Sequence, residues 1–156
     1  MKHASGAILL SMKTGNICLQ FRSDSVKHSR TWSFWGGKSE PGEKAVDTLL
    51  REVEEEIGFL PMIGKIIPLH TYTSKDENFA YYTYVITIPH EIHPKVNHET
   101  AGYCWTSLQS FPTPLHFGAK IVLLNKNVCN KIKQIYETQK DTLILNNFAE
   151  KIAVNK

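Results

Sequence analysis

The chain has 156 residues, enough for one compact domain with a buried core and too few for two domains of ordinary size. Hydrophobic residues make up 42% and charged residues 21%, which excludes a disordered polar chain, and no apolar run reaches the ~20 residues of a membrane-spanning helix. The net charge of only +3 does not indicate a strongly basic nucleic-acid surface. Three scattered cysteines without metal-site spacing argue against a disulfide framework or a structural zinc site: Cys18, Cys104 and Cys129. We expect one soluble, cytoplasmic domain over residues 1–156.

The first predicted elements are strands. Two apolar runs, residues 5–10 and 17–21, are separated by a turn-rich stretch that predicts a hairpin. A polar loop over residues 22–30 precedes a short aromatic strand, 32–35, which ends at a pair of glycines. A turn at residues 39–42 then leads into the most strongly patterned element of the chain.

That element is a helix over about residues 46–57, because its apolar residues recur at helical spacing: Val46, Leu49, Leu50, Val53 and Ile57. Gly58 stands where a C-terminal cap belongs. A second hairpin is predicted from residues 63–73 and 79–88, followed by a polar loop over 89–100 and a strand over 103–106. A second long helix is predicted around residues 121–136, and residues 142–156 would form a short terminal helix or a frayed tail.

Three carboxylates gather on one side of the first helix. Glu52, Glu55 and Glu56 are spaced i, i+3 and i+4, so they share a face along the edge of the apolar stripe. Like charges at this spacing repel, and the C-terminal end of a helix disfavours anions. A solvated acidic patch is the ordinary interpretation, but a divalent cation such as Mg²⁺ would relieve both conflicts.

The surrounding residues decide between these interpretations. The stretch from Gly37 to Phe59 matches G-x5-E-x7-R-E-U-x-E-E-x-G-U at every specified position, where U is a bulky apolar residue. This pattern resembles the complete Nudix box, and seven fixed identities make a chance match on the order of one in 10⁸. The resemblance implies an α/β fold, an α/β/α sandwich with a mixed β-sheet, and hydrolysis of a diphosphate bond.

The resemblance also implies roles for individual residues. The divalent cation, Mg²⁺ with Mn²⁺ as a substitute, would be held by the Gly37 carbonyl and by three carboxylates: Glu52, Glu55 and Glu56. Arg51 would hold the box carboxylates in place with Glu43 as its partner, and Gly58 would have a backbone role.

A general base must accept a proton from the attacking water. Some family members use the glutamate that matches Glu52, and others use a glutamate in a later loop, which Glu99 resembles. Glu99 could equally be an ordinary loop acid, so both assignments stay open.

Three further positions are candidates for substrate contact. Arg22 ends the second strand, where some relatives hold a phosphate-contacting arginine, although it could simply be solvated. Trp35 replaces the proline that many relatives have, and it either stacks on a nucleobase or packs. Of the alternating tyrosines of one strand, Tyr81, Tyr82 and Tyr84, one is a candidate for the edge of the pocket.

The expected substrate is a nucleoside diphosphate linked to another group, with ADP-ribose-like nucleotide sugars and dinucleoside polyphosphates ranked first. Alternatives are a nucleoside triphosphate pyrophosphohydrolase with a sanitising role, an RNA 5′-end pyrophosphohydrolase, or a non-catalytic nucleotide-binding sensor. We expect a small-molecule nucleotide partner and neither a membrane nor nucleic acid. The sequence leaves the oligomeric state open, a homodimer included.

Overall fold

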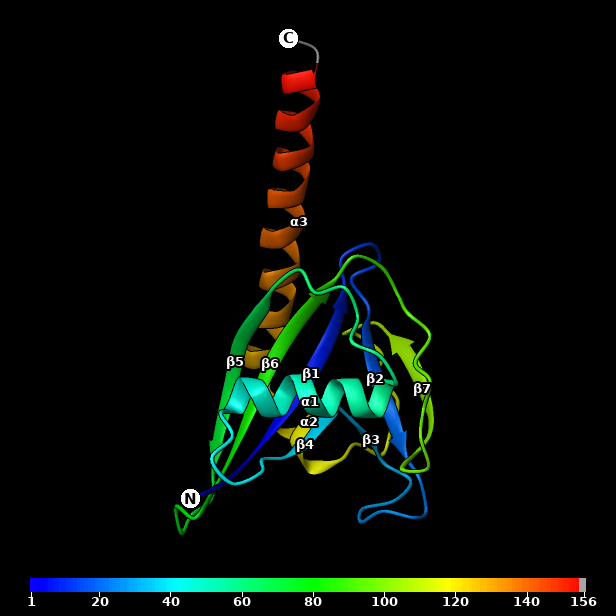
Figure 1. Cartoon of the computed structure of the whole chain (residues 1–156), viewed down its shortest axis with the longest axis vertical. Coiled ribbons are helices and arrows are strands. Elements are labelled where there is room, and N and C mark those ends of the chain that lie inside the picture. Colours follow the sequence, from blue (N-terminus) through cyan, green and yellow to red (C-terminus); the bar gives the residue numbers. More distant parts are fainter. Residues whose placement is uncertain (155–156) are drawn as a thin grey trace.

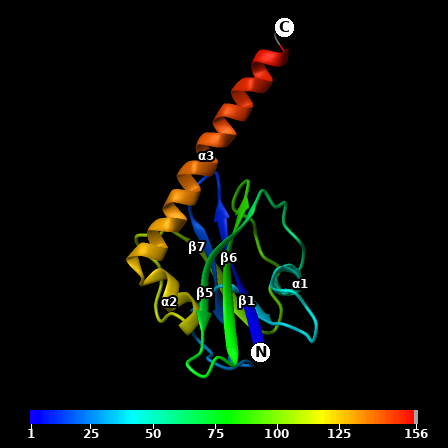
Figure 2. The same ribbon diagram turned by 90° about the vertical axis from the view of Figure 1, so that its left-hand side faces the viewer.

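A seven-stranded mixed sheet lies between helices on both of its faces, as Figure 1 and Figure 2 show. The computed structural model describes residues 1–154, without the side chains of residues 144 and 145. In chain order the elements are β1 (Lys2–Ser11), β2 (Ile17–Arg22), β3 (Trp32–Ser33), β4 (Trp35–Lys38), α1 (Ala45–Ile57), β5 (Ile66–Thr73), β6 (Phe79–Ile88), β7 (Thr100–Thr106), α2 (Phe117–Leu123) and α3 (Lys126–Val154). The α/β/α sandwich with a mixed sheet is confirmed.

The sheet divides along one edge of β1, and this division positions the site. On its other edge, β1 pairs in parallel with β6 along its whole length. On the divided edge, residues 4–7 of β1 pair with β4, whereas Leu9 and Leu10 pair with β2. Strands β3 and β7 pair with β2, so the chain crosses from one part of the sheet to the other at Phe34. The predicted strand over residues 32–35 is therefore two strands.

Each face of the sheet carries its own hydrophobic core. Because neighbouring residues of a strand point to opposite faces, Ile8 and Leu10 pack toward α2 and α3, whereas Ala7 and Leu9 pack toward α1. Figure 2 shows α1 on one side of the sheet and the other two helices on the opposite side. Burying both faces explains why the strands are apolar along nearly their whole length.

Two members of the predicted apolar stripe of α1 do not belong to its core. Val46 is 38% exposed and Leu50 is half-buried, whereas Thr48 is fully buried. The reason is local: the first turn of α1 faces the preceding loop, where the Thr48 hydroxyl lies 2.6 Å from the Glu43 carboxylate. The buried stripe therefore begins at Thr48 and Leu49.

The predicted helix around residues 121–136 is two helices. Helix α2 ends at Leu123, and α3 begins at Lys126 after the Asn125 side chain accepts hydrogen bonds from the N–H groups of Asn127 and Val128. Such N-capping breaks the α2 pattern and starts a new helix. Residues 142–154 are not a separate short helix, because they continue α3, and residues 155–156 lie outside the described part.

Helix α3 has 29 residues, and its distal half projects beyond the sheet (Figure 1). Ile132 of the first half is fully buried, whereas Leu143, Phe148 and Ile152 are exposed. No helix within residues 1–154 is long and apolar enough to cross a membrane.

Candidate active site

Helix α1 places four charged residues of the box beside the division in the sheet. It begins after Lys44 and ends at Gly58, where φ is 88° and the Gly58 N–H donates to the Glu54 carbonyl at 2.9 Å. A Cβ at this position would stand 2.9 Å from the Lys95 side chain and carbonyl, so glycine allows the later loop to pack against the helix end. The helix end is thereby fixed against a segment that approaches the site.

Arg51 ties the preceding turn to the carboxylates. Its Nε and Nη2 donate to the two Glu43 oxygens at 2.8 and 2.9 Å, and its Nη1 donates to Glu52 at 2.9 Å. A longer contact of 3.4 Å reaches Glu55, and Nη2 also donates to the Lys38 carbonyl. The Arg51 guanidinium, with Thr48, lowers the pKa of Glu43 to about 2. Such a planar fork holds two carboxylates in a set geometry.

Glu56 is a buried acid at the division in the sheet. It is only 5% exposed, and one of its carboxylate oxygens accepts hydrogen bonds from the Gly36 N–H at 2.7 Å and from the Gln20 amide at 3.1 Å. Burial raises its pKa to about 8, and the nearby charges of Glu52 and Glu99 act in the same direction. The folded protein thus holds a carboxylate whose negative charge its neighbours only partly balance.

Glu52 lies against the backbone of Gly37. A Cβ at Gly37 would stand 2.5 to 2.7 Å from the Glu52 carboxylate, so a side chain here would displace Glu52 from its present position. Burial raises the pKa of Glu52, opposed by its bond to Arg51 and reinforced by Glu55 and Glu99. Glu55 is the most accessible of the three, since 57% of its side chain is exposed. The three acids therefore span a gradient from buried to solvated.

The loop before β7 brings Glu99 near these acids. Its charge raises the pKa of both Glu52 and Glu56. The loop is anchored on either side of Glu99, because the Asn97 amide donates to the Glu55 carbonyl at 3.4 Å and the Thr100 hydroxyl donates to Gln20 at 2.8 Å. The Glu99 side chain itself is 48% exposed. Both candidate bases therefore face the same site.

The two predicted substrate contacts differ in their surroundings. Arg22 is half-buried, and its guanidinium donates to the Lys27 carbonyl at 2.7 and 3.0 Å. Trp35 is fully buried in the core beneath α1, and its indole N–H donates to the Cys18 carbonyl at 3.2 Å. Trp35 is thus unavailable for stacking on a base, and its assignment as a substrate contact is corrected to core packing.

Sequence reasoning missed the residues that hold Glu56. Gln20 is 2% exposed, and it links the Thr100 hydroxyl, the Phe34 carbonyl and the Glu56 carboxylate. Gly36 donates its N–H at a φ of 146°, where a Cβ would collide with the Ser5 carbonyl. One signal was present: a glutamine inside the otherwise apolar strand β2 indicates a buried polar network.

These residues fit a divalent cation that the protein ligates sparsely. Within residues 1–154, no three acidic, histidine or cysteine side chains cluster closely enough to coordinate an ion by themselves. Mg²⁺ does not require such a cage, because it keeps several waters and takes one or two carboxylates together with substrate phosphates. Burial, more than the neighbouring acids, raises the pKa of Glu52 and Glu56, and a bound cation would favour the ionised form of both carboxylates.

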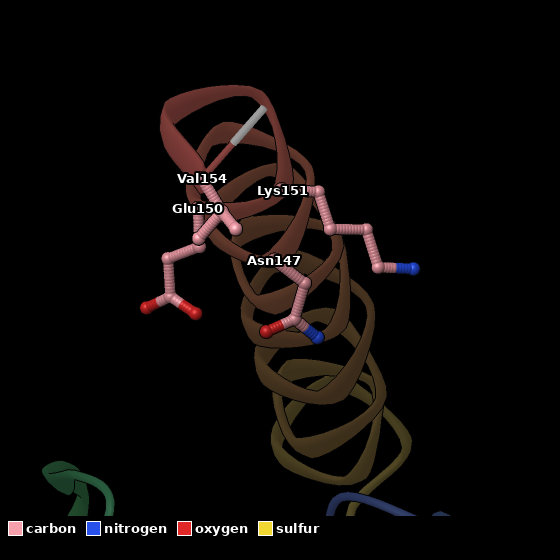
Figure 3. A pocket seen from close by; sticks show the side chains of 4 residues that line it. All are labelled: Asn147, Glu150, Lys151 and Val154. Carbon is pink, nitrogen blue, oxygen red and sulfur yellow. The ribbon is translucent and has the colours of Figure 1, made fainter. Parts of the chain in front are cut away.

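The surface hollows lie away from this site. One is formed by four side chains near the end of α3, Asn147, Glu150, Lys151 and Val154, which extend from a single helix without enclosing a space (Figure 3). Another lies between β5 and α3, bordered by Ile67, Leu69 and Ile135. Neither includes a predicted site residue, so the candidate site rests on the chemistry of its side chains.

Comparison with known proteins gives one matching family model and two similar curated proteins. A family model described as NUDIX domain matches residues 1–125. The chain is 34% identical over 58 residues to a CTP pyrophosphohydrolase of Escherichia coli, covering 37% of this chain and 43% of the relative. It is 30% identical over 88 residues to the nucleoside triphosphatase NudI of Escherichia fergusonii, covering 50% and 62%. The chain thus spans about half the length of the curated relatives it matches.

Solved structures share the fold at low identity. A MutT NUDIX hydrolase from Burkholderia pseudomallei superposes with a TM-score of 0.63 at 22% identity, covering 80% of this chain and 97% of that one. RenU, a Nudix hydrolase from M. smegmatis, gives a TM-score of 0.66 at 20% identity, covering 87% and 86%. At these identities the likeness establishes the fold alone.

Proposed function

Since the chain belongs to the Nudix hydrolase family, we propose that it uses Mg²⁺ to hydrolyse a diphosphate bond in a nucleotide. Members of the family generally use a divalent metal. The observation that carries the proposal is the Glu56 carboxylate, which is buried beside Glu52 on helix α1. The guanidinium of Arg51, on the same helix, is already bonded to Glu52 and to Glu43. A structural role alone would not account for burying like charges so close together.

In this proposal the cation is held by Glu52, Glu55, Glu56 and the Gly37 carbonyl. When bound, it would neutralise phosphoryl oxygens and make a water easier to deprotonate. The chain's own groups fix the remaining geometry: the Gly36 N–H and Gln20 hold the Glu56 carboxylate, and Arg51 holds Glu52. No covalent enzyme intermediate is required, since water attacks the phosphorus and the phosphate-bearing product leaves.

Glu52 is our preferred base over Glu99. Burial raises its pKa above the ordinary value, which makes it a stronger proton acceptor than a solvated carboxylate. Its position is also set by a packed helix, by Arg51 and by the Gly37 backbone. Glu99 lies on a loop with nearly half of its side chain in solvent, so its distance from a bound water would vary more.

Nucleoside triphosphates become the first substrate class to test, ahead of the nucleotide sugars and dinucleoside polyphosphates that the sequence ranked first. The reason is that both relatives, a CTP pyrophosphohydrolase and a nucleoside triphosphatase, are named for triphosphates. ADP-ribose-like and dinucleoside substrates contain the same diphosphate bond, so they remain the second candidate class.

A substrate panel tests the proposal directly. CTP, UTP, ATP, GTP, ADP-ribose and a dinucleoside polyphosphate would each be incubated with Mg²⁺ or Mn²⁺, and the phosphate-containing products identified by mass. We expect cleavage of at least one nucleotide in the wild type and none in Glu56→Gln. Tight nucleotide binding without any cleavage would instead support a non-catalytic nucleotide-binding sensor. Cleavage of only RNA that carries a 5′-triphosphate, added to the same panel, would support RNA 5′-end processing.

A further inference from the structure

Across β1 and β4 from the carboxylates of α1, the face of the sheet that α2 covers forms a second wall, and Tyr81 of β6 is its central residue. The aromatic ring of Tyr81 lies between two glycines, Gly6 of β1 and Gly118 of α2. A Cβ at Gly6 would collide with the Tyr81 hydroxyl, and a Cβ at Gly118 would stand 2.9 Å from Cε1 and 3.1 Å from the hydroxyl. The missing side chains of two separate elements therefore leave the space that this ring occupies.

The glycine seat connects Tyr81 to the acids. Gly6 is paired with Gly36 across β1 and β4, and the Gly36 N–H is the group that binds Glu56. The Tyr81 hydroxyl thus lies against Gly6 of β1, and the residue paired with Gly6 on β4 binds the buried Glu56 carboxylate. Burial and the Glu56 charge raise the pKa of Tyr81, while the Arg22 charge acts in the opposite direction. The net shift is upward, so the Tyr81 phenol stays protonated.

A polar, uncharged residue lies two positions before Gly118. His116 precedes α2, and its Nδ1 accepts a hydrogen bond from the Gly118 N–H at 3.2 Å. Burial, with Arg22 and His28 nearby, lowers the pKa of His116 to about 4, so the imidazole is neutral at physiological pH. Its ring meets His28 edge to face at a centroid distance of 5.4 Å. This wall can therefore form neutral hydrogen bonds and aromatic contacts.

The Tyr81 hydroxyl has no hydrogen-bond partner that would explain its position. No group among the described residues is bonded to it, so its hydrogen-bonding capacity is unused in the structure. By contrast, the Tyr103 hydroxyl is paired with His93 at 3.1 Å. A tyrosine ring held between two glycines, with its hydroxyl unpaired and within range of the Glu56 charge, has the features of a ligand contact.

Resting on the proposed function, we propose that Tyr81 is a specificity-determining residue whose hydroxyl hydrogen-bonds the nucleobase of the substrate. The division of chemistry between the two walls supports the nucleobase rather than the phosphates. The carboxylate wall with its cation would take the charged diphosphate, and Tyr81 and His116 are uncharged groups suited to a base. The charged group near both, Arg22, is already bonded to the Lys27 carbonyl.

Tyr81→Phe tests this inference, with Tyr82→Phe as its matched control. Phenylalanine keeps the ring in the space between Gly6 and Gly118. Tyr82 is the next residue of the same strand, and its ring faces the core beneath α1 and the His3 ring. For CTP, UTP and ATP, which differ only in the base, kcat and KM would be measured separately. We expect Tyr81→Phe to change the ratios of kcat/KM among the three by about 3- to 10-fold, mainly through KM, as for one neutral hydrogen bond. Tyr82→Phe should leave these ratios unchanged.

Two results would overturn the inference. An equal loss for all three nucleotides would mean that Tyr81 acts on the shared phosphates or on the fold, and no loss would mean that it contacts no substrate. If the wild type cleaved none of the three nucleotides, the proposed function would fail, but the inference about Tyr81 could still be tested. Dissociation constants of the same nucleotides, measured by calorimetry in Ca²⁺, would then replace kcat/KM in the comparison. Unequal changes in those constants would still support Tyr81 as a nucleobase contact, and equal ones would reject it.

Discussion

Helices α1 and α3 use their residues in opposite ways. Helix α1 has 13 residues, and it combines a fully buried apolar stripe with Glu56 buried at 5% exposure and an arginine bonded to the preceding turn. Helix α3 has 29 residues, but its distal half carries exposed apolar groups such as Phe148, which is 63% exposed. Tertiary contacts therefore constrain one whole side of the first helix and few positions in the distal half of the second.

The difference between the two helices shows which residues affect the free energy of unfolding. A buried like-charge group such as Glu56 lowers the stability of the metal-free fold, and its retention on the best-packed helix indicates a function. In the distal half of α3, stability depends on local helix propensity alone, which is marginal for so short a segment. Substitutions in the two helices should consequently have very different effects, and the following experiments test that contrast from the largest to the smallest.

Glu56→Gln should have the largest effect. The variant keeps the size and hydrogen-bonding capacity of the side chain but loses its charge, so we expect turnover to fall by several orders of magnitude. Activity would be measured on the best substrate of the panel across Mg²⁺ concentrations. Near-normal turnover of the variant at low Mg²⁺ would contradict the assignment of Glu56 as a ligand.

The same variant should alter how the stability of the metal-free protein depends on pH. The pKa of Glu56 is raised to about 8 in the folded state, well above 4.5, so the unfolded chain ionises this group first as pH rises. The resulting stability is fully present below about pH 4.5 and is lost as pH rises through 8. Thermal unfolding in EDTA between pH 5 and pH 9 should show this decline in the wild type and a smaller one in Glu56→Gln.

The choice of base predicts the next effect. If Glu52 accepts the proton, Glu52→Gln at saturating Mg²⁺ should lower kcat by roughly 10²–10⁴-fold and remove the acidic limb of the pH profile, while Glu99→Gln costs little. If Glu99 is the base, the two results exchange. Profiles of kcat against pH for both variants decide, and an acidic limb that persists in Glu52→Gln would reject our preference.

Arg51→Lys should have an intermediate effect. Lysine keeps the positive charge but has no planar fork, so it cannot hold Glu43 and Glu52 together as Arg51 does. We expect kcat to fall by about 10- to 100-fold, which corresponds to one charge-assisted hydrogen bond of ~1.5–3 kcal/mol. Full activity in the variant would show that the charge alone matters.

Most of α1 and its site could be predicted from sequence because the signals are local. The apolar spacing, the three acids and Gly58 all lie within one short segment, and Gly58 does cap the helix at φ 88°. The surroundings of Glu56 were not predictable in the same way. Gln20 and Thr100 are 80 positions apart in the chain, and they meet only because β2 pairs with β7.

The errors have physical reasons of the same kind. Trp35 is adjacent to the glycines of the site, but its side chain points into the core beneath α1 and is fully buried there, as the packing alternative predicted. The two C-terminal helices share a helical apolar period, which concealed the break where the Asn125 side chain caps α3. Periodicity detects the face of a helix and does not detect a cap inside it.

The smallest effect is expected in the distal half of α3. Leu49→Ala in α1 should lower the free energy of unfolding by ~2–5 kcal/mol, because Leu49 is fully buried. Ala149→Gly carries a local cost of about 1 kcal/mol in a helix interior, yet it should not change the cooperative unfolding of the domain. Urea unfolding of both variants tests this, and a clear loss of stability in Ala149→Gly would show that the distal half is part of the core.

The projecting half of α3 should also differ from the rest of the molecule in the rate of amide hydrogen exchange. Amides of α1 and of the first turns of α3 exchange only when packed structure opens, so they should be protected for the longest times. Amides beyond residue 142 need only local fraying, and they should exchange nearly as fast as those of an isolated peptide helix. One continuous helix would then contain a slowly exchanging segment and a rapidly exchanging one, and the boundary between them would mark where contact with the sheet ends.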